Sequence, residues 1–129
     1  MCILRFAWHA KNKSVFSIGI QFGTAGLRGR MAAGFSCMNS LTVIQTSQGL
    51  AKYIKNKHLN LSHLGVVIAH DSRHNSHKFA TLAASAFVTM GITVHWYENL
   101  SPTPLVSFGV ERLRAVAGIM ITASHVSSF

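Results

Sequence analysis

The sequence predicts an α/β fold in which short buried strands alternate with amphipathic helices. Three apolar runs have the length of buried strands, at residues 64–69, 92–97 and 115–122. A helical pattern separates each run from the next, as a parallel sheet with crossover helices requires. At 129 residues, the chain has the length of one domain.

The first helix is predicted to follow residue 38. Either Asn39 or Ser40 suits its N-cap, and Lys55 and Lys57 lie near its end, where positive charge complements the helix dipole. Its apolar face repeats at three- and four-residue steps, which predicts one buried side. This face comprises Val43, Ile44, Ser47, Leu50, Ala51 and Ile54.

Two further helices are predicted between the strands. The first ends at Gly91, a typical C-cap residue. Its buried face comprises Phe79, Leu82, Ala83, Ala86, Phe87 and Met90. The second helix carries Pro104 in its first turn and Thr103 as its cap. We expect its larger apolar residues to face the core, namely Leu105, Phe108 and Leu113.

The composition excludes some classes of protein. Hydrophobic residues make up 49% of the chain and charged residues 12%, which excludes intrinsic disorder. No apolar stretch approaches the roughly 20 residues that span a bilayer, so we expect no membrane partner. Cys2 and Cys37 suit a reducing compartment, and we expect a cytoplasmic protein. A mitochondrial presequence at residues 1–20 is the alternative.

The charge balance is strongly positive. The chain has 12 Lys and Arg residues and 3 Asp and Glu residues, which gives a formal net charge of +9. Such a chain attracts anions, such as phosphorylated metabolites or nucleic acid. Alternatively, acidic parts of a longer protein are missing from this chain.

Polar residues follow two of the predicted strands. Asp71 and Arg73 come after one strand, and Ser124 and His125 come after the last one. Ligands of parallel sheets bind beyond the carboxyl ends of the strands, so we expect these residues at one edge. Asp71 could hold a backbone turn, orient an arginine, cap a helix or act in catalysis. Ser124 suits a nucleophile or a phosphate carrier with His125 as acid or base. A Ser-His-Asp triad is conceivable, although the G-x-S-x-G elbow is absent.

The stretch FGTAGLRGRMAAG contains four glycines, of which Gly23, Gly26 and Gly29 are regularly spaced. It is a poor dinucleotide-binding loop, because no helix follows directly and no acid lies about 20 residues on. Arg28 within it either offers a fork of donors to a phosphate or lies in an ordinary surface turn. A metal site is not expected at His70, His74 and His77, because their spacing is mediocre and their neighbours are basic.

Four motifs in order carry a family resemblance: FGTAGLRG, GVVIAHDSR, SPTP and GIMITASH. Over residues 22–125 the chain resembles the first domain of the α-D-phosphohexomutase family, closest to its phosphoglucomutase and phosphopentomutase branch. The resemblance implies a three-layer α/β/α sandwich with a mixed, mainly parallel sheet. The two ends of the chain do not resemble the family. We expect a non-family N-terminal extension at residues 1–21 and a non-family C-terminal end at residues 126–129.

The resemblance also implies a phosphosugar mutase. Ser124 matches the serine that bears the transferable phosphate, and His125 is its neighbour in the same loop. Arg28 matches an arginine facing the reacting phosphate, and Arg73 one near the same cleft. Hexose or pentose monophosphates and bisphosphates are the implied substrates. The implied cofactor is Mg²⁺, bound partly through the phosphate on Ser124.

Departures from the family pattern follow Ser124. The family continues with Asn-Pro and a later Asn-Gly-Tyr/Phe-Lys, where this chain has Val126, Ser127, Ser128 and Phe129. The Mg²⁺-binding loop, the sugar-reading loop and the last phosphate-binding domain have no counterpart. We therefore expect a truncated first domain, inactive alone, from a truncated product or an unspliced gene model. The alternative is a non-catalytic basic fragment that binds nucleic acid or a full-length mutase. Nucleic acid is disfavoured because aromatic residues do not interleave with the basic ones.

Overall fold

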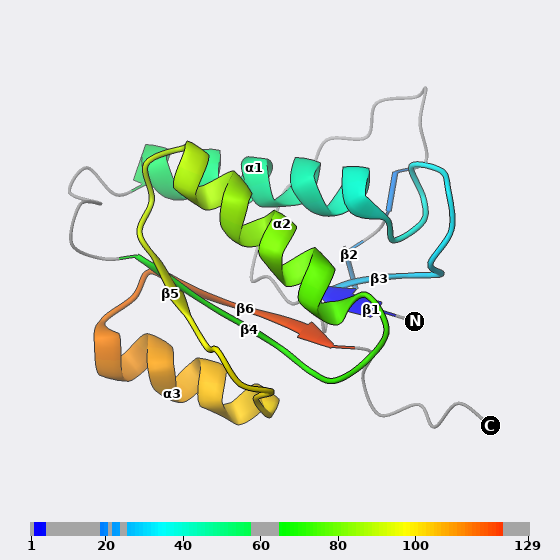
Figure 1. Cartoon of the computed structure of the whole chain (residues 1–129). Helices are drawn as coiled ribbons and strands as arrows, with labels where there is room; N and C mark the ends of the chain where they lie inside the picture. Colours follow the sequence, from blue (N-terminus) through cyan, green and yellow to red (C-terminus); the bar gives the residue numbers. More distant parts are fainter. Residues whose placement is uncertain (1, 5–18, 21, 24–25, 58–64, 123–129) are drawn as a thin grey trace.

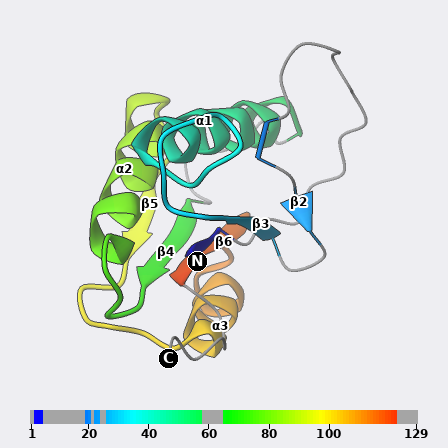
Figure 2. The ribbon, with the colours of Figure 1, turned by 90° about the vertical axis from the view of Figure 1, so that its right-hand side faces the viewer.

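The computed structural model describes residues 2–4, 19–20, 22–23, 26–57 and 65–122. Within these residues one mixed sheet of six strands carries helices on both faces (Figures 1 and 2). The elements in chain order are β1 (Cys2–Leu4), β2 (Phe22–Gly23), β3 (Gly26–Gly29), α1 (Ser40–Lys57), β4 (Val66–His70), α2 (Ser76–Thr89), β5 (Val94–Trp96), α3 (Thr103–Leu113) and β6 (Ala117–Thr122). The predicted α/β fold is confirmed.

The sheet has a parallel half and an antiparallel half, in the order β2-β3-β1-β6-β4-β5. The three strands predicted from the sequence, β4, β5 and β6, pair in parallel. The short strands β1, β2 and β3 were not predicted, and they join the sheet antiparallel. β1, from the start of the chain, lies between β3 and β6 and so connects the two halves.

Three layers enclose two apolar clusters. Helices α1 and α2 cover one face of the sheet and α3 covers the other (Figure 2). In β4, Val66 and Ile68 pack toward α1 and α2, whereas Val67 and Ala69 pack toward α3. This alternation explains why every residue of β4 is buried, as its unbroken apolar run predicted.

Asn39, one of the two predicted caps, begins α1. Its Oδ1 accepts a hydrogen bond from the Thr42 N–H at 3.1 Å, and its own N–H donates to Thr42 Oγ1 at 3.0 Å. This reciprocal pair satisfies backbone donors that a helix start would otherwise leave unpaired. The predicted face of α1 is buried or half-buried throughout, and Lys55 and Lys57 occupy its last turn.

Met90 is the C-cap of α2, and Gly91, the predicted C-cap, is the residue directly after it. The φ of Gly91 is +73°, a left-handed conformation that side chains disfavour. The Gly91 N–H donates to the Val88 carbonyl at 2.9 Å, and the Ile92 N–H donates to the Phe87 carbonyl at 3.0 Å. These two bonds form a Schellman motif, which pairs the last carbonyls of the helix.

Two predictions for α3 were wrong. Thr103 is not the cap: Pro102 holds that position, and no side-chain cap hydrogen bond forms. Leu105, Phe108 and Leu113 are exposed by 39%, 60% and 46% instead of facing the core.

The buried residues of α3 are Val106 and Gly109. Small residues allow this close approach, because a Cβ on Gly109 would lie 2.9 Å from Tyr97 Oη, and one on Gly118 of β6 would lie 2.6 Å from Val106 Cγ1. The larger apolar side chains therefore point outward. Among the described helices, none is both long and apolar enough to cross a membrane.

Candidate functional site

The carboxyl ends of β4 and β6 lie side by side, and the loop after β4 is fixed to β6. His70 registers with Ile121, and the Asp71 N–H donates a hydrogen bond to the Ile121 carbonyl at 3.1 Å. Asp71, 51 positions before Thr122, therefore lies beside the end of β6, and Arg73 is hydrogen-bonded to Asp71 through its backbone N–H. For the described residues, the prediction that both strand ends meet at one edge is confirmed.

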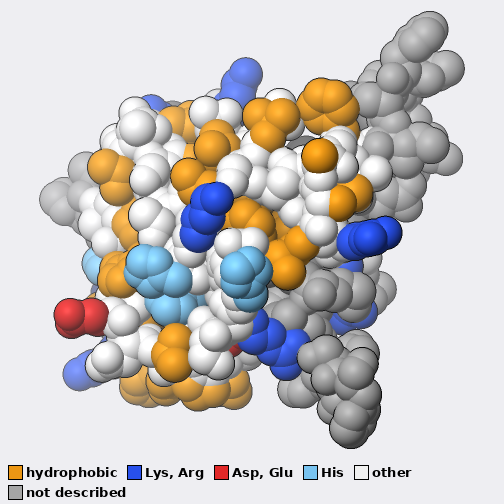
Figure 3. Space-filling model, turned by 45° about the vertical axis from the view of Figure 1, so that its right-hand side comes forward, with side chains coloured by type: hydrophobic (Ala, Val, Ile, Leu, Met, Phe, Trp, Pro, Cys, Tyr) orange, Lys and Arg blue, Asp and Glu red, His pale blue; other side chains and the backbone are white. Residues whose placement is uncertain are grey.

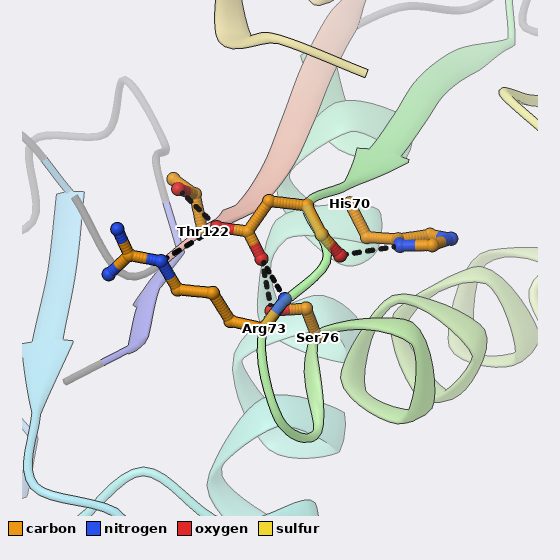
Figure 4. A network of polar contacts seen from close by, with 5 residues as sticks. His70, Arg73, Ser76 and Thr122 are labelled. Carbon is orange, nitrogen blue, oxygen red and sulfur yellow. Dashed lines mark hydrogen bonds and ion pairs between the residues drawn. The ribbon is translucent and has the colours of Figure 1, made fainter. Parts of the chain in front are cut away.

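Asp71 is the centre of a polar network at this edge (Figure 4). Its Oδ2 accepts a hydrogen bond from Thr122 Oγ1 at 2.8 Å. Its Oδ1 accepts from Ser76 Oγ at 2.6 Å and from the Arg73 N–H at 3.1 Å. One half-buried carboxylate thus joins the end of β6, the loop after β4 and the first turn of α2.

Arg73 forms a loose ion pair with the same carboxylate. Its Nε lies 3.6 Å from Asp71 Oδ2, and the two side chains are 44% and 20% exposed. Exposed pairs of this kind contribute about 1 kcal/mol or less, so Asp71 does not hold the guanidinium tightly. Figure 4 shows the two terminal nitrogens of Arg73 turned away from Asp71. They can therefore receive a second anion, such as a phosphate, in a two-pronged contact.

The turn between β4 and α2 explains how these groups are placed. The Ser76 N–H donates to the Arg73 carbonyl at 3.0 Å, and Asn75 has a left-handed φ of 66°. No acidic residue occupies the first turn of α2, so its positive end is not neutralised by its own side chains. Asp71 therefore holds this turn through the Arg73 N–H and Ser76, and its contact with the Arg73 guanidinium is loose.

Arg28 lies on the same sheet, two strands from Thr122. It is exposed on β3, in a hairpin with β2 and not in a dinucleotide-binding loop. Arg28 and Thr122 both register with Ile3 of β1, one on each side. Residues directly opposite on neighbouring strands point to the same face, and two strand spacings amount to about 10 Å. Arg28 is therefore on the Thr122 face, within reach of a ligand bound between them.

His70 has a structural role that the sequence did not reveal. It is 4% exposed, and its Nδ1 donates to the Asp71 carbonyl at 2.9 Å, whereas its Nε2 is buried without a partner. Its ring lies 4.9 Å from the His77 ring and 5.6 Å from the Trp96 ring. His74 is exposed. The three histidines thus do not act as one group: two pack with a tryptophan behind the Asp71 loop.

Comparison with known proteins identifies the family. The family model described as "Phosphoglucomutase/phosphomannomutase, alpha/beta/alpha domain I" matches residues 19–127. The chain belongs to this family. The resemblance inferred from four motifs is confirmed.

Several curated phosphosugar enzymes are similar to this phosphoglucomutase/phosphomannomutase domain. The chain is 46% identical over 119 residues to the phosphopentomutase of Mus musculus, covering 88% of this chain and 19% of that one. It is 48% identical over 117 residues to the probable phosphoribomutase of Schizosaccharomyces pombe, covering 91% and 20%. It is 42% identical over 110 residues to the glucose 1,6-bisphosphate synthase of Homo sapiens, covering 81% and 18%.

The chain spans about a fifth of the length of these relatives. It corresponds to the α/β/α domain I alone. No solved structure matches the chain.

The predicted phosphate carrier lies outside the described residues. Ser124 and His125 both fall there, and Thr122 is the last described residue before them. The structure therefore brings together Asp71, Arg73 and Thr122, with Arg28 nearby, and the roles of Ser124 and His125 stay predictions. Thr122, two positions before Ser124, was missed as a site residue. Its place in the motif GIMITASH was the available signal.

The described residues do not fit a Mg²⁺ site. Mg²⁺ prefers oxygen ligands in octahedral geometry, and the whole sequence contains three carboxylates. Only Asp71 belongs to the network at this edge, and its oxygens already accept hydrogen bonds from two hydroxyls and an N–H. Glu98 follows the edge strand β5, and Glu111 is at the far end of α3. Within the described ranges there is no group of three or more metal-binding side chains.

Proposed function

We propose that the chain is the first domain of a phosphosugar mutase and that Ser124 carries its transferable phosphoryl group. A hydroxyl oxygen of a hexose or pentose monophosphate attacks the phosphorus, and Ser124 Oγ leaves, which gives a sugar bisphosphate. Ser124 Oγ then attacks the phosphorus at the other end of the bisphosphate. The isomeric monophosphate leaves, and the phosphoserine is restored.

The hydrogen bond between Asp71 and Thr122 carries this proposal. It fixes the strand that leads to Ser124 beside the turn that presents Arg73. Arg28 points to the same face of the sheet from the other side of β1. Phosphoryl transfer depends on positioning and on neutralising the charge of the phosphoryl oxygens, and two arginines supply this charge.

Two further parts of the proposal concern groups outside the described residues. His125, next to the phosphate carrier, serves as an acid, a base or a hydrogen-bond donor to the phosphate. Mg²⁺ is the proposed cofactor, and the phosphate on Ser124 supplies one of its ligands. Since the described residues offer no further site for this ion, its remaining ligands come from elsewhere.

We expect the 129-residue chain alone to give no measurable turnover. Losing a single electrostatic contact typically costs about 100- to 1000-fold in rate, and this chain lacks most of the length of its relatives. The test incubates the chain and Mg²⁺ for hours with a hexose 1,6-bisphosphate or a pentose 1,5-bisphosphate, because a single slow transfer needs a far lower rate than turnover. Mass spectrometry then measures phosphate on Ser124. A Ser124→Ala variant is the control, and a coupled assay measures mutase turnover. Phosphate on Ser124 without turnover supports the proposal. Modification of other residues only, or none, contradicts it.

The outer face of α3 favours a second candidate function. Leu105, Phe108 and Leu113 expose apolar surface on one helix, and such patches mark contacts with other protein surfaces. The chain would then be an interaction fragment that binds the remaining domains of a mutase in a second polypeptide. Size-exclusion chromatography with light scattering tests this candidate, alone and with a full-length mutase. A strictly monomeric chain that does not co-elute with the mutase contradicts it.

A further inference from the structure

We propose that Asp71 is a positioning residue that couples Arg73 to the end of β6 through the hydroxyl of Thr122. The consequence for catalysis rests on the proposed function. The coupling itself rests on contacts in the described residues and can be tested without enzymatic activity.

Thr122 and Arg73 approach the same oxygen of Asp71. Thr122 Oγ1 lies 2.8 Å from Oδ2, whereas Arg73 Nε lies 3.6 Å from it. A charge-assisted N–H bond to a carboxylate normally measures about 2.7–2.9 Å. The hydroxyl therefore holds the better position on Oδ2, and it keeps the ion pair with Arg73 long.

The rest of Asp71 is held in place from several directions. Its Oδ1 accepts from Ser76 Oγ at 2.6 Å, and its N–H donates to the Ile121 carbonyl at 3.1 Å. Its carbonyl accepts from His70 Nδ1 at 2.9 Å. Asp71 is thus anchored to α2, β6 and β4 at once. Arg73, 44% exposed, is the partner that can move.

This arrangement allows Arg73 to exchange partners. A phosphate dianion arriving at the edge can take the guanidinium from Asp71, because the pair is long and solvated. Asp71 keeps its bonds to Thr122 and Ser76 during the exchange, so the end of β6 stays fixed. The carboxylate thus orients Arg73 without competing strongly with the phosphate.

Two substitutions at the shared oxygen should have opposite effects on phosphate binding. Thr122→Val removes the hydroxyl and keeps the shape, so Arg73 closes onto Oδ2 and binds inorganic phosphate about fivefold more weakly. Asp71→Asn removes the counter-charge, so Arg73 binds phosphate more tightly. Thr122→Ser restores the hydroxyl and should restore the wild-type affinity. A merely structural role for Asp71 would weaken binding in both variants.

The experiment titrates each full-length 129-residue variant with inorganic phosphate and follows the Arg73 Nε–H signal by NMR. Thr81→Val is the matched control, because the Thr81 hydroxyl donates to a helix carbonyl far from Asp71. Hydrogen exchange of the Asp71 backbone amide is measured in parallel. Its rate should rise in Thr122→Val and return to the wild-type value in Thr122→Ser. The proposal is overturned if the phosphate affinity changes in the same direction in Thr122→Val and Asp71→Asn. It is also overturned if the phosphate affinity of Thr122→Val equals that of the wild type.

A separate arm distinguishes this proposal from the proposed function. If wild-type Ser124 accepts phosphate from a sugar bisphosphate, Thr122→Val should slow this step and Thr122→Ser should restore it. An unchanged rate in Thr122→Val overturns the catalytic part of the proposal. If wild-type Ser124 accepts none, the proposed function fails, and the phosphate titration still decides whether Asp71 couples Arg73 to β6.

Discussion

Gly118 of β6 lies directly beneath Val106 of α3. A Cβ at position 118 would come 2.6 Å from Val106 Cγ1 and 2.8 Å from Val110 Cγ2, closer than unstrained contacts allow. Both valines are branched at Cβ and cannot turn away easily. Helix α3 therefore rests on the sheet at the distance that this glycine permits.

Replacing Gly118 by alanine should lower the free energy of unfolding by about 1–3 kcal/mol, because α3 must move outward to make room. Urea denaturation measures the change. Gly49→Ala is the matched control: nothing lies within 4 Å of a Cβ there, and the position is exposed on α1. That variant should gain about 0.5–1 kcal/mol from helix propensity. Equal effects at both glycines would contradict the close packing of α3.

Two buried serines should respond in opposite directions to alanine. Ser47 is 0% exposed and its Oγ has no hydrogen-bond partner, so Ser47→Ala should raise the unfolding free energy, by about 1 kcal/mol. Ser76 is 1% exposed and donates to Asp71 at 2.6 Å. Ser76→Ala should lower the unfolding free energy by about 1.5–3 kcal/mol. Chemical denaturation measures the unfolding free energy of both variants. An equal loss of unfolding free energy in Ser47→Ala and Ser76→Ala would contradict the prediction.

Asn39 should contribute more than an ordinary cap. Besides capping α1 through Thr42, its Nδ2 donates to the Ala32 carbonyl at 3.0 Å and the Gly34 carbonyl at 2.9 Å. Asn39→Ala should therefore cost about 2 kcal/mol, at the upper end of the range for caps. Thermal and urea unfolding measure the loss. Asn56→Ala, at an exposed position near the end of α1, should change stability by less than about 0.5 kcal/mol.

The outward face of α3 predicts a difference between neighbouring apolar residues. Phe108 is 60% exposed, so Phe108→Gln should change the unfolding free energy by less than about 0.5 kcal/mol. Val106 is 6% exposed and packs with β4 and β6, so Val106→Ala should cost about 1–3 kcal/mol. Urea denaturation measures the unfolding free energy of both variants. If Phe108 is instead a contact with other proteins, light scattering should show less self-association in Phe108→Gln.

Arg28 should affect phosphate chemistry and not stability. Its side chain is exposed, so Arg28→Gln should leave the unfolding free energy within about 0.5 kcal/mol of wild type. Phosphorylation of Ser124 by a sugar bisphosphate should slow by about 100-fold, because a positive charge near the phosphate is lost. Quantitative mass spectrometry over time measures the rate. A normal rate in Arg28→Gln would remove this arginine from the site.

The sequence predicted the parts of the fold that depend on local pattern. The faces of α1 and α2 and the Asn39 cap follow from spacing and side-chain chemistry, and the structure confirms them. The short strands β1, β2 and β3 are set by pairing with distant residues, so periodicity gave no signal for them. The orientation of α3 was wrong because Gly109 and Gly118 determine it, and neither appears in a count of large apolar residues.

The site was predicted in outline only. Parallel strand ends brought Asp71 and Arg73 to the edge where the strand before Ser124 ends, as expected. The partners of Asp71 were not predictable, because hydroxyls of Thr122 and Ser76 are common and carry no pattern. The burial of His70 against Trp96 was likewise hidden, since the two positions meet only through the pairing of β4 with β5.

The placement of β1 makes the spacing between Arg28 and the end of β6 depend on residues 2–4. β3, which carries Arg28, and β6, which leads to Ser124, do not touch each other in the sheet; both are paired to Cys2–Leu4. A change at residues 2–4 would therefore alter the spacing between Arg28 and Thr122. Engineered versions of the domain are therefore comparable only when this short central strand is left unchanged.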